Sequence, residues 1–443
     1  MHGRPGILGA VAACAAAAGM AFSADGGGDG GSAARPWVLE AYLEPDPGPP
    51  PGLLGPAVAL SARRAAVGAG RNHDTGRDSA SVHCYDLVTD GWALRQVLQE
   101  PQGAVAADYG AALAMDGDHL IVGAPRDSEG AFEAGRVHVY ARSARTWKLS
   151  QTLEAAEPQV AAAYGAAVAV DRRVLAVGSP RRDVAGSQDA GAVDVFEQDG
   201  RRWRRAATLT APVPDTSAWF GSAVAVQGDL LAVGAHGHHA GGSAAGQVHL
   251  FRRAAEGGWT LQATLTPPWP GPAWFGYSLA LDRDSLLVGA PRAERPGRSP
   301  GVSAGAAFLF ERRGAAWIRT GVLAPHLLEA GDGFGVAVAI SQEWAVVGAT
   351  GDDEFGEDAG AVFVHRRRGG AGVGSGETLS IPVLSEGDHV GAALAFVRGR
   401  LLVGRGGNPE RDPLPGAAYL YASPGLGAPP PTSPTRPPGR QAG

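Results

Sequence analysis

The stretch Tyr109-Gly-Ala-Ala-Leu-Ala-Met115, followed by Asp116-Gly-Asp118 and then by His119-Leu-Ile-Val-Gly123, decides the fold of this 443-residue chain. Two short apolar runs separated by an Asp/Gly-rich turn predict a β-hairpin. An equivalent stretch opens after an aromatic or aliphatic residue and a Gly seven times, at Leu54-Gly55, Tyr109-Gly110, Tyr164-Gly165, Phe220-Gly221, Phe275-Gly276, Phe334-Gly335 and Val390-Gly391. The successive glycines lie 55, 55, 56, 55, 59 and 56 residues apart, so one structural unit is repeated in tandem.

The residue pattern within each unit predicts four strands. After the hairpin, a polar loop at 126–135 leads to Arg136-Val-His-Val-Tyr140, in which apolar and polar residues alternate. A second turn precedes Trp147-Lys-Leu-Ser-Gln-Thr-Leu153, which alternates as well. This period of two is typical of β-strands, and no helical periodicity separates the units.

The first strand of each unit is apolar on both faces. It reads Ala112-Leu-Ala-Met115 in one unit and Ala167-Val-Ala-Val170 in the next. We therefore expect this strand to be buried on both sides. Alanines on one face and larger residues on the other suit sheets that converge on a common axis, so the pattern favours a radial arrangement over a linear stack.

The two ends of the repeat region complete each other. Trp37–Leu43 resembles the fourth strand of a unit but precedes the first unit, whereas the seventh unit ends at Ala417–Tyr421 without a fourth strand. We therefore predict an all-β fold, a seven-bladed β-propeller of four-stranded antiparallel blades over residues 36–422. The N-terminal strand closes the ring by pairing into the last blade, which leaves no open sheet edge at the seam.

The flanking segments predict export. Gly6–Phe22 is small and apolar, and residues 1–24 resemble a signal peptide cleaved after Ser23 or Ala24, followed by a linker at 25–35. A lipoprotein box at Cys14 ranks second, because the apolar run continues past it. Residues 423–443 are predicted to be a disordered Pro-rich tail. The mature protein is expected to be secreted or located in the periplasm or cell envelope, with no membrane span.

Composition narrows the function classes. The formal net charge is −6 and no block of Lys and Arg occurs, so nothing favours nucleic acid as a partner. Cys84 is the one cysteine outside the predicted leader. Because it lies in an alternating apolar strand, we expect a packed core thiol rather than a reactive one.

The unit resembles the FG-GAP repeat of the integrin α-chain propeller and of secreted bacterial FG-GAP proteins. Phe-Gly stands at Phe220-Gly221, and Gly-Ala-Pro stands at Gly123-Ala124-Pro125 and Gly289-Ala290-Pro291. The resemblance implies calcium loops between the two motifs. Here that interval is a two- or three-residue turn such as Asp116-Gly117-Asp118, which has too few oxygens for calcium. We therefore expect no integrin-type calcium site and no cofactor, and calcium binding elsewhere in the chain stays open.

Two tryptophans stand apart from the repeat. Trp219 and Trp274 precede the Phe-Gly pairs of adjacent units, so they should lie on the same face as the long loops between second and third strands. There they could anchor a protein partner or stack on a sugar, although burial as local packing is an equal alternative. The further binding-face candidates are loop residues, namely Arg71, Asn72, His73, Asp74, Asp127, Asp183, His236 and His238.

Metal binding is the weaker interpretation of two loops. Asp352, Asp353 and Asp358 form an acidic cluster, but similarly placed acids before Gly in other units favour a turn that caps the loop backbone. His236, His238 and His239 lie in a Gly-rich loop with no carboxylate nearby in sequence, which favours a solvated loop.

No catalytic residue is assigned from the sequence. The leading hypothesis is an exported, non-enzymatic binding or adhesion module that presents one propeller face to an extracellular protein or glycan. The first alternative is a hydrolase or lyase that uses loop carboxylates such as Asp74, Asp127, Asp183 and Asp352. Two carboxylates and a histidine converging in one pocket would favour that alternative. The second alternative is a structural element of the cell envelope.

Overall fold

A computed structural model describes residues 36–43, 54–69, 80–101, 107–240, 243–297, 303–324, 329–368, 372–382, 384–406 and 418–424. The chain divides into the units Met1–Pro36 and Trp37–Gly443, and the fold belongs to the second. The predicted leader, Cys14, the linker and nearly all of the Pro-rich tail lie outside the described residues. Within the described part, no helix has the length and apolar character needed to cross a membrane.

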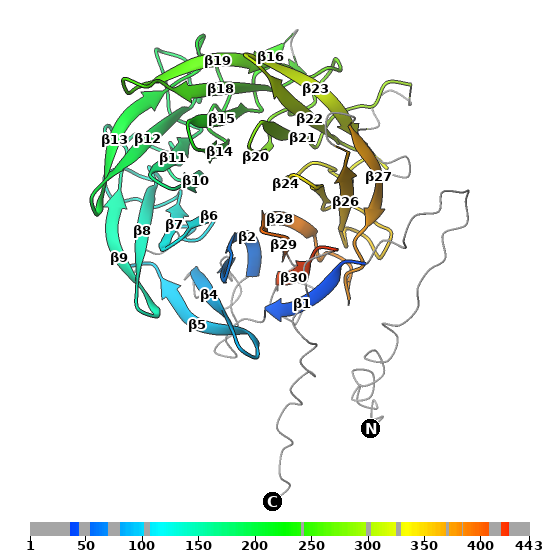
Figure 1. Ribbon diagram of the computed structural model, residues 1–443. Helices are drawn as coiled ribbons and strands as arrows, with labels where there is room; N and C mark the ends of the chain where they lie inside the picture. Colours follow the sequence, from blue (N-terminus) through cyan, green and yellow to red (C-terminus); the bar gives the residue numbers. More distant parts are fainter. Residues whose placement is uncertain are drawn as a thin grey trace, which may run out of the picture. The chain divides into compact units, whose positions relative to one another are not determined.

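Seven four-stranded antiparallel sheets form a ring, as predicted (Figure 1). Blades 1 to 3 are β2(Leu54–Ser61), β3(Arg64–Ala69), β4(Ser81–Val88), β5(Gly91–Gln99); β6(Ala112–Asp116), β7(His119–Ala124), β8(Arg136–Ser143), β9(Thr146–Leu153); and β10(Ala167–Asp171), β11(Val174–Ser179), β12(Ala192–Asp199), β13(Arg202–Leu209). Blades 4 and 5 are β14(Ala223–Gln227), β15(Leu230–Ala235), β18(Gln247–Arg253), β19(Trp259–Leu265); and β20(Ser278–Asp282), β21(Ser285–Ala290), β22(Ala306–Arg313), β23(Ala316–Leu323). Blade 6 is β24(Ala337–Ile340), β25(Trp344–Ala349), β26(Ala361–Arg367), β27(Val373–Thr378), and a small hairpin, β16(His239–Ala240) and β17(Ser243–Ala244), lies in the long loop of blade 4.

The ring closes through the N-terminal strand, as predicted. Blade 7 consists of β28(Val390–Val397), β29(Arg400–Arg405), β30(Ala418–Ala422) and, as its outer strand, β1(Val38–Leu43). β1 pairs antiparallel with β30, for example Leu43 with Ala418. Arg400 also holds β1 in place, because its guanidinium donates to both carboxylate oxygens of Glu40, at 2.6 and 3.2 Å. The contacts join residues 360 positions apart in the sequence.

In blades 2 to 5 the second strand is more buried than the innermost strand, which corrects one expectation. In blades 1 and 6 the innermost strand is buried at Ala57–Leu60 and Ala337–Ile340, as expected. β11, β15 and β21 are buried throughout, whereas the innermost strands β6, β14 and β20 are only half-buried. The prediction of a first strand buried on both sides is therefore wrong for blades 2 to 5. The reason is the axial space of a seven-bladed ring, a cavity of about 750 Å³ that one large residue from each innermost strand lines: Leu60, Met115, Val170, Val226, Leu281, Ile340 and Phe396.

The predicted packing of small against large faces is confirmed. Ala59 of blade 1 lies in a cluster with Leu113 and Met115 of blade 2, whereas Val58, on the other face of the same strand, packs against Ala393 of blade 7. Cys84 belongs to the cluster between blades 1 and 2 and is 2% exposed. Burial raises the pKa of its thiol to about 12, so it is a packed core residue, as expected.

The paired glycines of each repeat hold the blades together. Within blade 4, the N–H of Gly221 donates to the carbonyl of Gly234 at 2.8 Å. Between blades, the carbonyl oxygen of Gly221 lies so close to Gly178 of blade 3 that a Cβ there would stand 2.0 Å from it. The same approach recurs between Gly68 and Gly110, Gly123 and Gly165, Gly234 and Gly276, Gly289 and Gly335, and Gly348 and Gly391. The regular spacing of the motif therefore follows from backbone contact between neighbouring blades.

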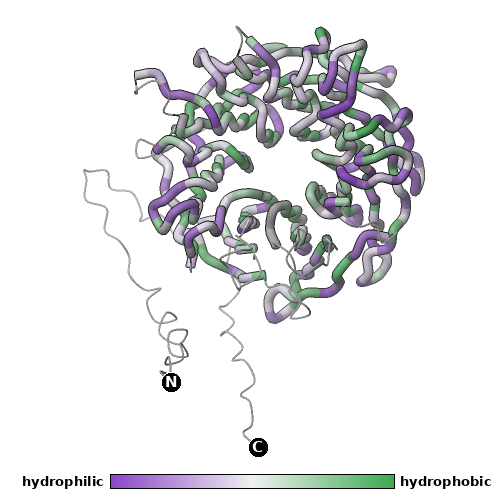
Figure 2. The backbone as a smooth tube through the Cα atoms, turned by 180° about the vertical axis from the view of Figure 1, so that it is seen from behind, coloured by the Kyte–Doolittle hydropathy of each residue, from purple (hydrophilic) through white to green (hydrophobic). Residues whose placement is uncertain are grey.

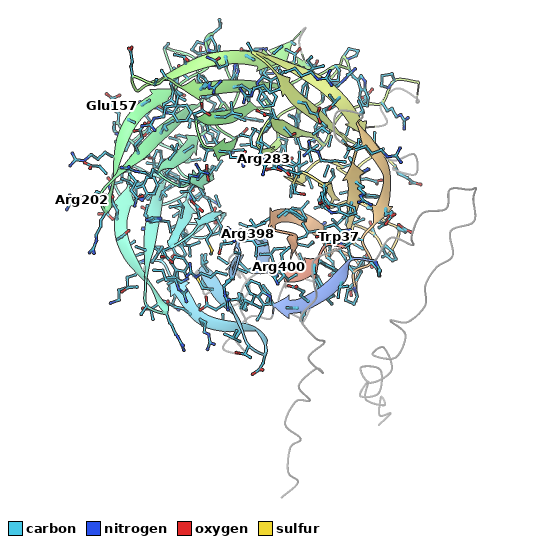
Figure 3. All side chains as sticks on the ribbon, viewed as in Figure 1. Trp37, Glu157, Arg202, Arg283, Arg398 and Arg400 are labelled. Carbon is cyan, nitrogen blue, oxygen red and sulfur yellow. The ribbon has the colours of Figure 1, made fainter. Side chains whose placement is uncertain are left out.

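The circumference is polar and also links the blades. Gln151 on β9 donates to the carbonyl of Trp203 and accepts from its N–H, both at 2.9 Å. Trp203 itself is 3% exposed, so its indole packs into the protein. Figure 2 shows the ring from behind, with hydrophilic segments frequent along its rim. Glu157 and Arg202 lie on this circumference, whereas Arg283 and Arg398 lie near the axis (Figure 3).

Candidate functional site

The ring has two dissimilar faces. We call the loop face the one formed by the long loops between second and third strands and by the connections between blades. The turn face is formed by the short turns between first and second strands, such as Gly117-Asp118. Trp219, from the connection into blade 4, lies 5.0 Å from His236, from the long loop of that blade. This contact places the tryptophans and the long loops on the same face, as predicted.

An aromatic cluster spans blades 4 and 5 on the loop face. It consists of Trp219, His236, Trp274 and Tyr277. The ring of His236 lies 5.7 Å from Trp274 and 5.0 Å from Tyr277. Trp274 and Tyr277 stack with their planes 10° apart and their centroids 5.8 Å apart. Both tryptophans are partly exposed, so the cluster is neither buried core nor a set of free side chains.

A cation lies on this cluster. The guanidinium of Arg292, an exposed residue, lies over the ring of Trp274 at 3.9 Å from its centroid, which is a close cation–π contact. Trp219 packs on the backbone of Gly237, where an added Cβ would lie 2.8 Å from the indole. The side chains are therefore held in place before any partner arrives.

The backbone at both tryptophans is left-handed. Trp219 has φ 54° and Trp274 has φ 53°. The position before the Phe-Gly or equivalent pair is left-handed in four further blades too, where the residue is Asp108, Ala163, Gly333 or His389. The fold therefore imposes this conformation, which costs a side chain about 1–2 kcal/mol relative to Gly. The backbone conformation therefore does not explain why a tryptophan stands at this position in blades 4 and 5.

His236 is a neutral aromatic residue rather than a base. Burial lowers its pKa from 6.5 to about 4, and no neighbouring charge contributes to this shift. The hydroxyl of Ser222 lies 2.7 Å from its Nδ1. A hydroxyl and an imidazole are two parts of a nucleophile relay, but that chemistry needs a basic imidazole and a third group that orients it. In the part of the chain that the structure describes, neither condition is met at His236.

The other histidines of this loop have a carboxylate partner that the sequence did not reveal. Nδ1 of His238 lies 3.4 Å from Asp215, and Nδ1 of His239 lies 3.6 Å from the same oxygen. Asp215 belongs to the connection before Trp219 and is 23 residues away from His238 along the chain. The three histidines therefore separate into one that contacts aromatic rings and two that lie beside the carboxylate of Asp215.

The predicted loop carboxylates have separate surroundings. Asp127 is 1% exposed and does not reach the surface. Asp183 is exposed, and its Oδ1 accepts from the N–H of Asp189 at 2.9 Å. Arg71, Asn72, His73 and Asp74 lie outside the described residues.

The acidic cluster of blade 6 caps its own loop. Oδ1 of Asp352 accepts from the N–H of Glu354 at 3.1 Å, and Oδ1 of Asp353 accepts from the N–H of Asp358 at 2.7 Å. These are the Asx-type contacts that the sequence favoured. The described residues do contain one group of side chains that converges closely enough to hold a metal ion, but it lies elsewhere. It consists of Glu100, Asp127 and His138.

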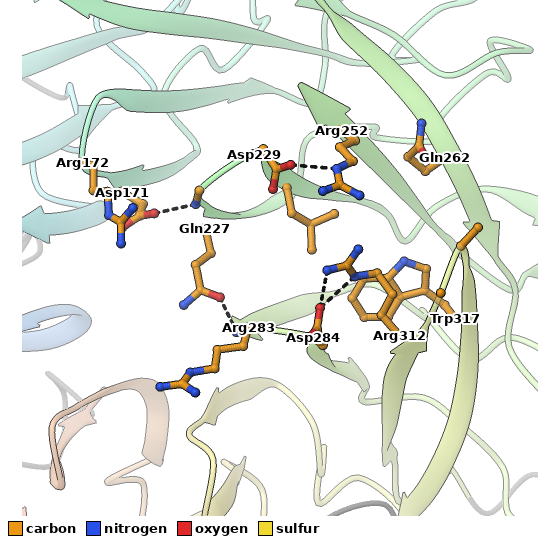
Figure 4. A pocket seen from close by; sticks show the side chains of 14 residues that line it. Asp171, Arg172, Gln227, Asp229, Arg252, Gln262, Arg283, Asp284, Arg312 and Trp317 are labelled. Atoms are coloured by element: carbon orange, nitrogen blue, oxygen red, sulfur yellow. Dashed lines mark hydrogen bonds and ion pairs between the residues drawn. The ribbon is translucent and has the colours of Figure 1, made fainter. Parts of the chain in front are cut away.

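The turn face carries a polar pocket of about 360 Å³ between blades 3, 4 and 5 (Figure 4). Its charged side chains already pair with one another, as in Arg252 with Asp229 at 2.7 Å and Arg312 with Asp284 at 2.8 Å. Asp171 accepts from the N–H of Gly228 in the next blade at 2.6 Å. The side chains of these turns therefore join neighbouring blades.

Comparison with known proteins agrees with the geometry. The model of the FG-GAP repeat matches four segments of the chain, residues 92–140, 203–251, 259–310 and 317–365. Each match runs from the tryptophan that begins one outer strand to the third strand of the next blade. No curated protein matches the chain in sequence.

Proposed function

Because this chain is an FG-GAP repeat protein, we propose that it is an exported binding or adhesion module whose aromatic cluster anchors a protein partner. The observation that carries the proposal is the placement of Trp219 and Trp274. Two adjacent blades bear a large indole at a left-handed position that Gly fills in blade 6. Both side chains stand partly exposed on the loop face.

The composition of the cluster favours a protein partner. Trp, Tyr and Arg are the residue types enriched at the energetic centres of protein interfaces. Pre-packed side chains lose little conformational entropy on binding, so more of the contact energy remains for affinity. A sugar needs an open indole face, but Trp274 already stacks with Tyr277 and bears Arg292 on its ring. A glycan ligand is therefore the second candidate.

Two carboxylates and a histidine, the set that would favour an enzyme, do converge at Glu100, Asp127 and His138. These side chains are only 0–7% exposed, whereas the aromatic cluster is partly exposed, so we keep the non-enzymatic role as the first candidate. His236 has a depressed pKa and, among the described residues, no carboxylate that orients it, and the exposed Asp183 is held in its own turn.

Export is proposed from the apolar leader at Gly6–Phe22. Sequencing the N-terminus of the secreted protein tests it, with Ala24 or Asp25 as the expected first residue.

A binding screen with matched variants tests the function. The mature protein is probed against arrays of secreted proteins and of glycans, and affinities are then measured for Trp219→Ala, Trp274→Ala and the control Phe355→Ala. Phe355 is 52% exposed and lies in the long loop of blade 6, outside the cluster. We expect either tryptophan variant to weaken binding of the protein partner about 30-fold or more, which corresponds to about 2 kcal/mol. Unchanged affinity in both tryptophan variants, or binding to glycans alone, contradicts the proposal.

A further inference from the structure

A second group of side chains converges at the junction of blades 1 and 2. Glu100 directly follows the outer strand of blade 1, Asp127 lies in the long loop of blade 2, and His138 lies on the third strand of blade 2. One ligand atom from each residue lies within 4.8 Å of the others. His138 is 0% and Asp127 1% exposed, and the side chain of Glu100 is 7% exposed.

In both His138 and Asp127 one polar atom of the side chain has a polar contact, and a second polar atom has no hydrogen bond. Nδ1 of His138 lies 3.3 Å from the hydroxyl of Thr152, while its Nε2 faces Glu100 at 3.7 Å without a hydrogen bond. Oδ1 of Asp127 accepts from the N–H of Glu129 at 2.8 Å and lies 3.2 Å from Nε of Arg136, while its Oδ2 has no hydrogen bond. A buried polar atom without a partner is uncommon and costs about 1–3 kcal/mol.

The surroundings of this group have an excess of negative charge. Arg136 is a cation next to this group, and it pairs with Glu129 and Glu154 as well as with Asp127. Glu100 adds a further carboxylate beside Asp127 and His138, so in the described part of the chain the carboxylates of this group outnumber its guanidinium. A histidine binds a metal as the neutral imidazole, through the lone pair of a ring nitrogen, and Nε2 of His138 is the ring nitrogen that faces the two carboxylates.

We propose that Glu100, Asp127 and His138 form a site for a divalent transition-metal cation, and that Zn²⁺ is the cation it suits best. Zinc is held by imidazole nitrogen and carboxylate oxygen, and three protein ligands leave its fourth position for water. A histidine ligand argues against Ca²⁺ and Mg²⁺, which take oxygen. Metal-bound side chains are typically fixed by a second contact on their other polar atom. Thr152 supplies that contact to His138, and Arg136 with the N–H of Glu129 supplies it to Asp127.

Blade 4 repeats the histidine without the carboxylates. Nδ1 of His249 lies 3.2 Å from the hydroxyl of Thr264, as His138 does from Thr152. The equivalent of Asp127 is His238, and the equivalent of Glu100 is Ala211. His249 therefore has the same strand position and the same threonine contact but lacks the rest of the site, which makes it a matched control.

Calorimetric titration tests the proposal. Tag-free protein treated with a chelator is titrated with ZnCl₂, and the visible absorption of the Co²⁺ form reports nitrogen and oxygen ligation. We expect one tight equivalent of Zn²⁺ for the wild type and for His249→Gln. We expect affinity at least 100-fold weaker for His138→Gln and at least 10-fold weaker for Glu100→Gln.

Circular dichroism checks that each variant is folded. If His138→Gln does not fold, Glu100→Gln decides, because its amide keeps the shape of the side chain and it lies at the edge of the core. Failure of the wild type to bind Zn²⁺, or affinity that stays unchanged in the folded variants, overturns the proposal. Equal loss in His249→Gln overturns it as well, since that result places the metal elsewhere.

Discussion

Replacing Gly178 by alanine tests the physical reason for the repeated glycine pairs. The added Cβ would lie 2.0 Å from the carbonyl oxygen of Gly221 and 3.0 Å from the carbonyl carbon. An ordinary contact needs about 3.4 Å or more, so the backbones of blades 3 and 4 must separate by over 1 Å. Gly178 pairs with Val193 in the ladder of blade 3, and Gly221 donates its N–H to the carbonyl of Gly234, so neither backbone can move alone.

The size of the effect follows from two opposing terms. Overpacking a well-packed site costs about 1–3 kcal/mol, and a clash of a Cβ with fixed backbone lies at the upper end. The alanine restricts the unfolded chain and returns about 0.4–1 kcal/mol. We therefore expect a net loss of about 2 kcal/mol in the free energy of unfolding. For a domain of about 390 residues, with about 2.1 cal/mol/K per residue, this lowers Tm by about 2–3 °C.

Scanning calorimetry measures the effect, with Gly200→Ala as the control. Gly200 lies in an exposed turn with φ 62° and open space around the site of its Cβ. Its replacement carries the cost of a left-handed alanine, about 1 kcal/mol, without a clash. Gly178 does not have a positive φ, so its cost is purely steric. A Gly178→Ala protein as stable as the wild type refutes the role assigned to the glycine pairs.

Two other changes test the closure of the ring and its response to acid. Glu40→Gln removes the carboxylate that pairs with Arg400. Because the side chain of Glu40 is 3% exposed, we expect the free energy of unfolding measured in urea to fall by about 3 kcal/mol. Asp199→Asn, which breaks an exposed ion pair, is the control and should lower it by less than about 1 kcal/mol. Burial lowers the pKa of His249 to about 4, so below about pH 6.5 the unfolded chain binds a proton at this residue that the folded chain does not bind. The free energy of unfolding therefore falls as the pH is lowered from 6.5 toward 4, by up to about 1.4 kcal/mol per pH unit. His249→Phe, chosen because Phe308 occupies the same position in blade 5, should make this fall shallower between pH 7 and 5, and an unchanged pH dependence would show that the histidine is not its source.

The repeat period determined what could be predicted about the fold. Alternation within Arg136–Tyr140 and Trp147–Leu153 depends only on local sequence, and the displaced strand at Trp37–Leu43 was visible as a missing fourth strand in the last unit. Burial of the innermost strand was overestimated in blades 2 to 5. An apolar strand looks the same whether it faces a neighbouring blade or the axial cavity, and the width of that cavity depends on the number of blades.

The candidate sites depended on contacts between blades, which the sequence shows poorly. Trp219 and Trp274 could be selected because they depart from the repeat, but Tyr277 and Arg292 join them only through the fold. Asp215 meets His238 across a connection, and Glu100 meets His138 across a blade boundary. A comparison of equivalent positions would have given one signal, because the third strand holds His83, His138 and His249 where blades 5 and 6 hold Phe308 and Phe363.

Hydrogen exchange at the N-terminal strand tests the closed ring most directly. Mass spectrometry of deuterated peptides compares Val38–Leu43 with Arg202–Leu209, the outer strand of blade 3. Because Val38–Leu43 pairs with Ala418–Ala422 and is fixed by Arg400, we predict protection comparable to that of the blade 3 strand. Exchange of Val38–Leu43 at the rate of an unfolded chain, while Arg202–Leu209 stays protected, would contradict closure of the propeller by this strand.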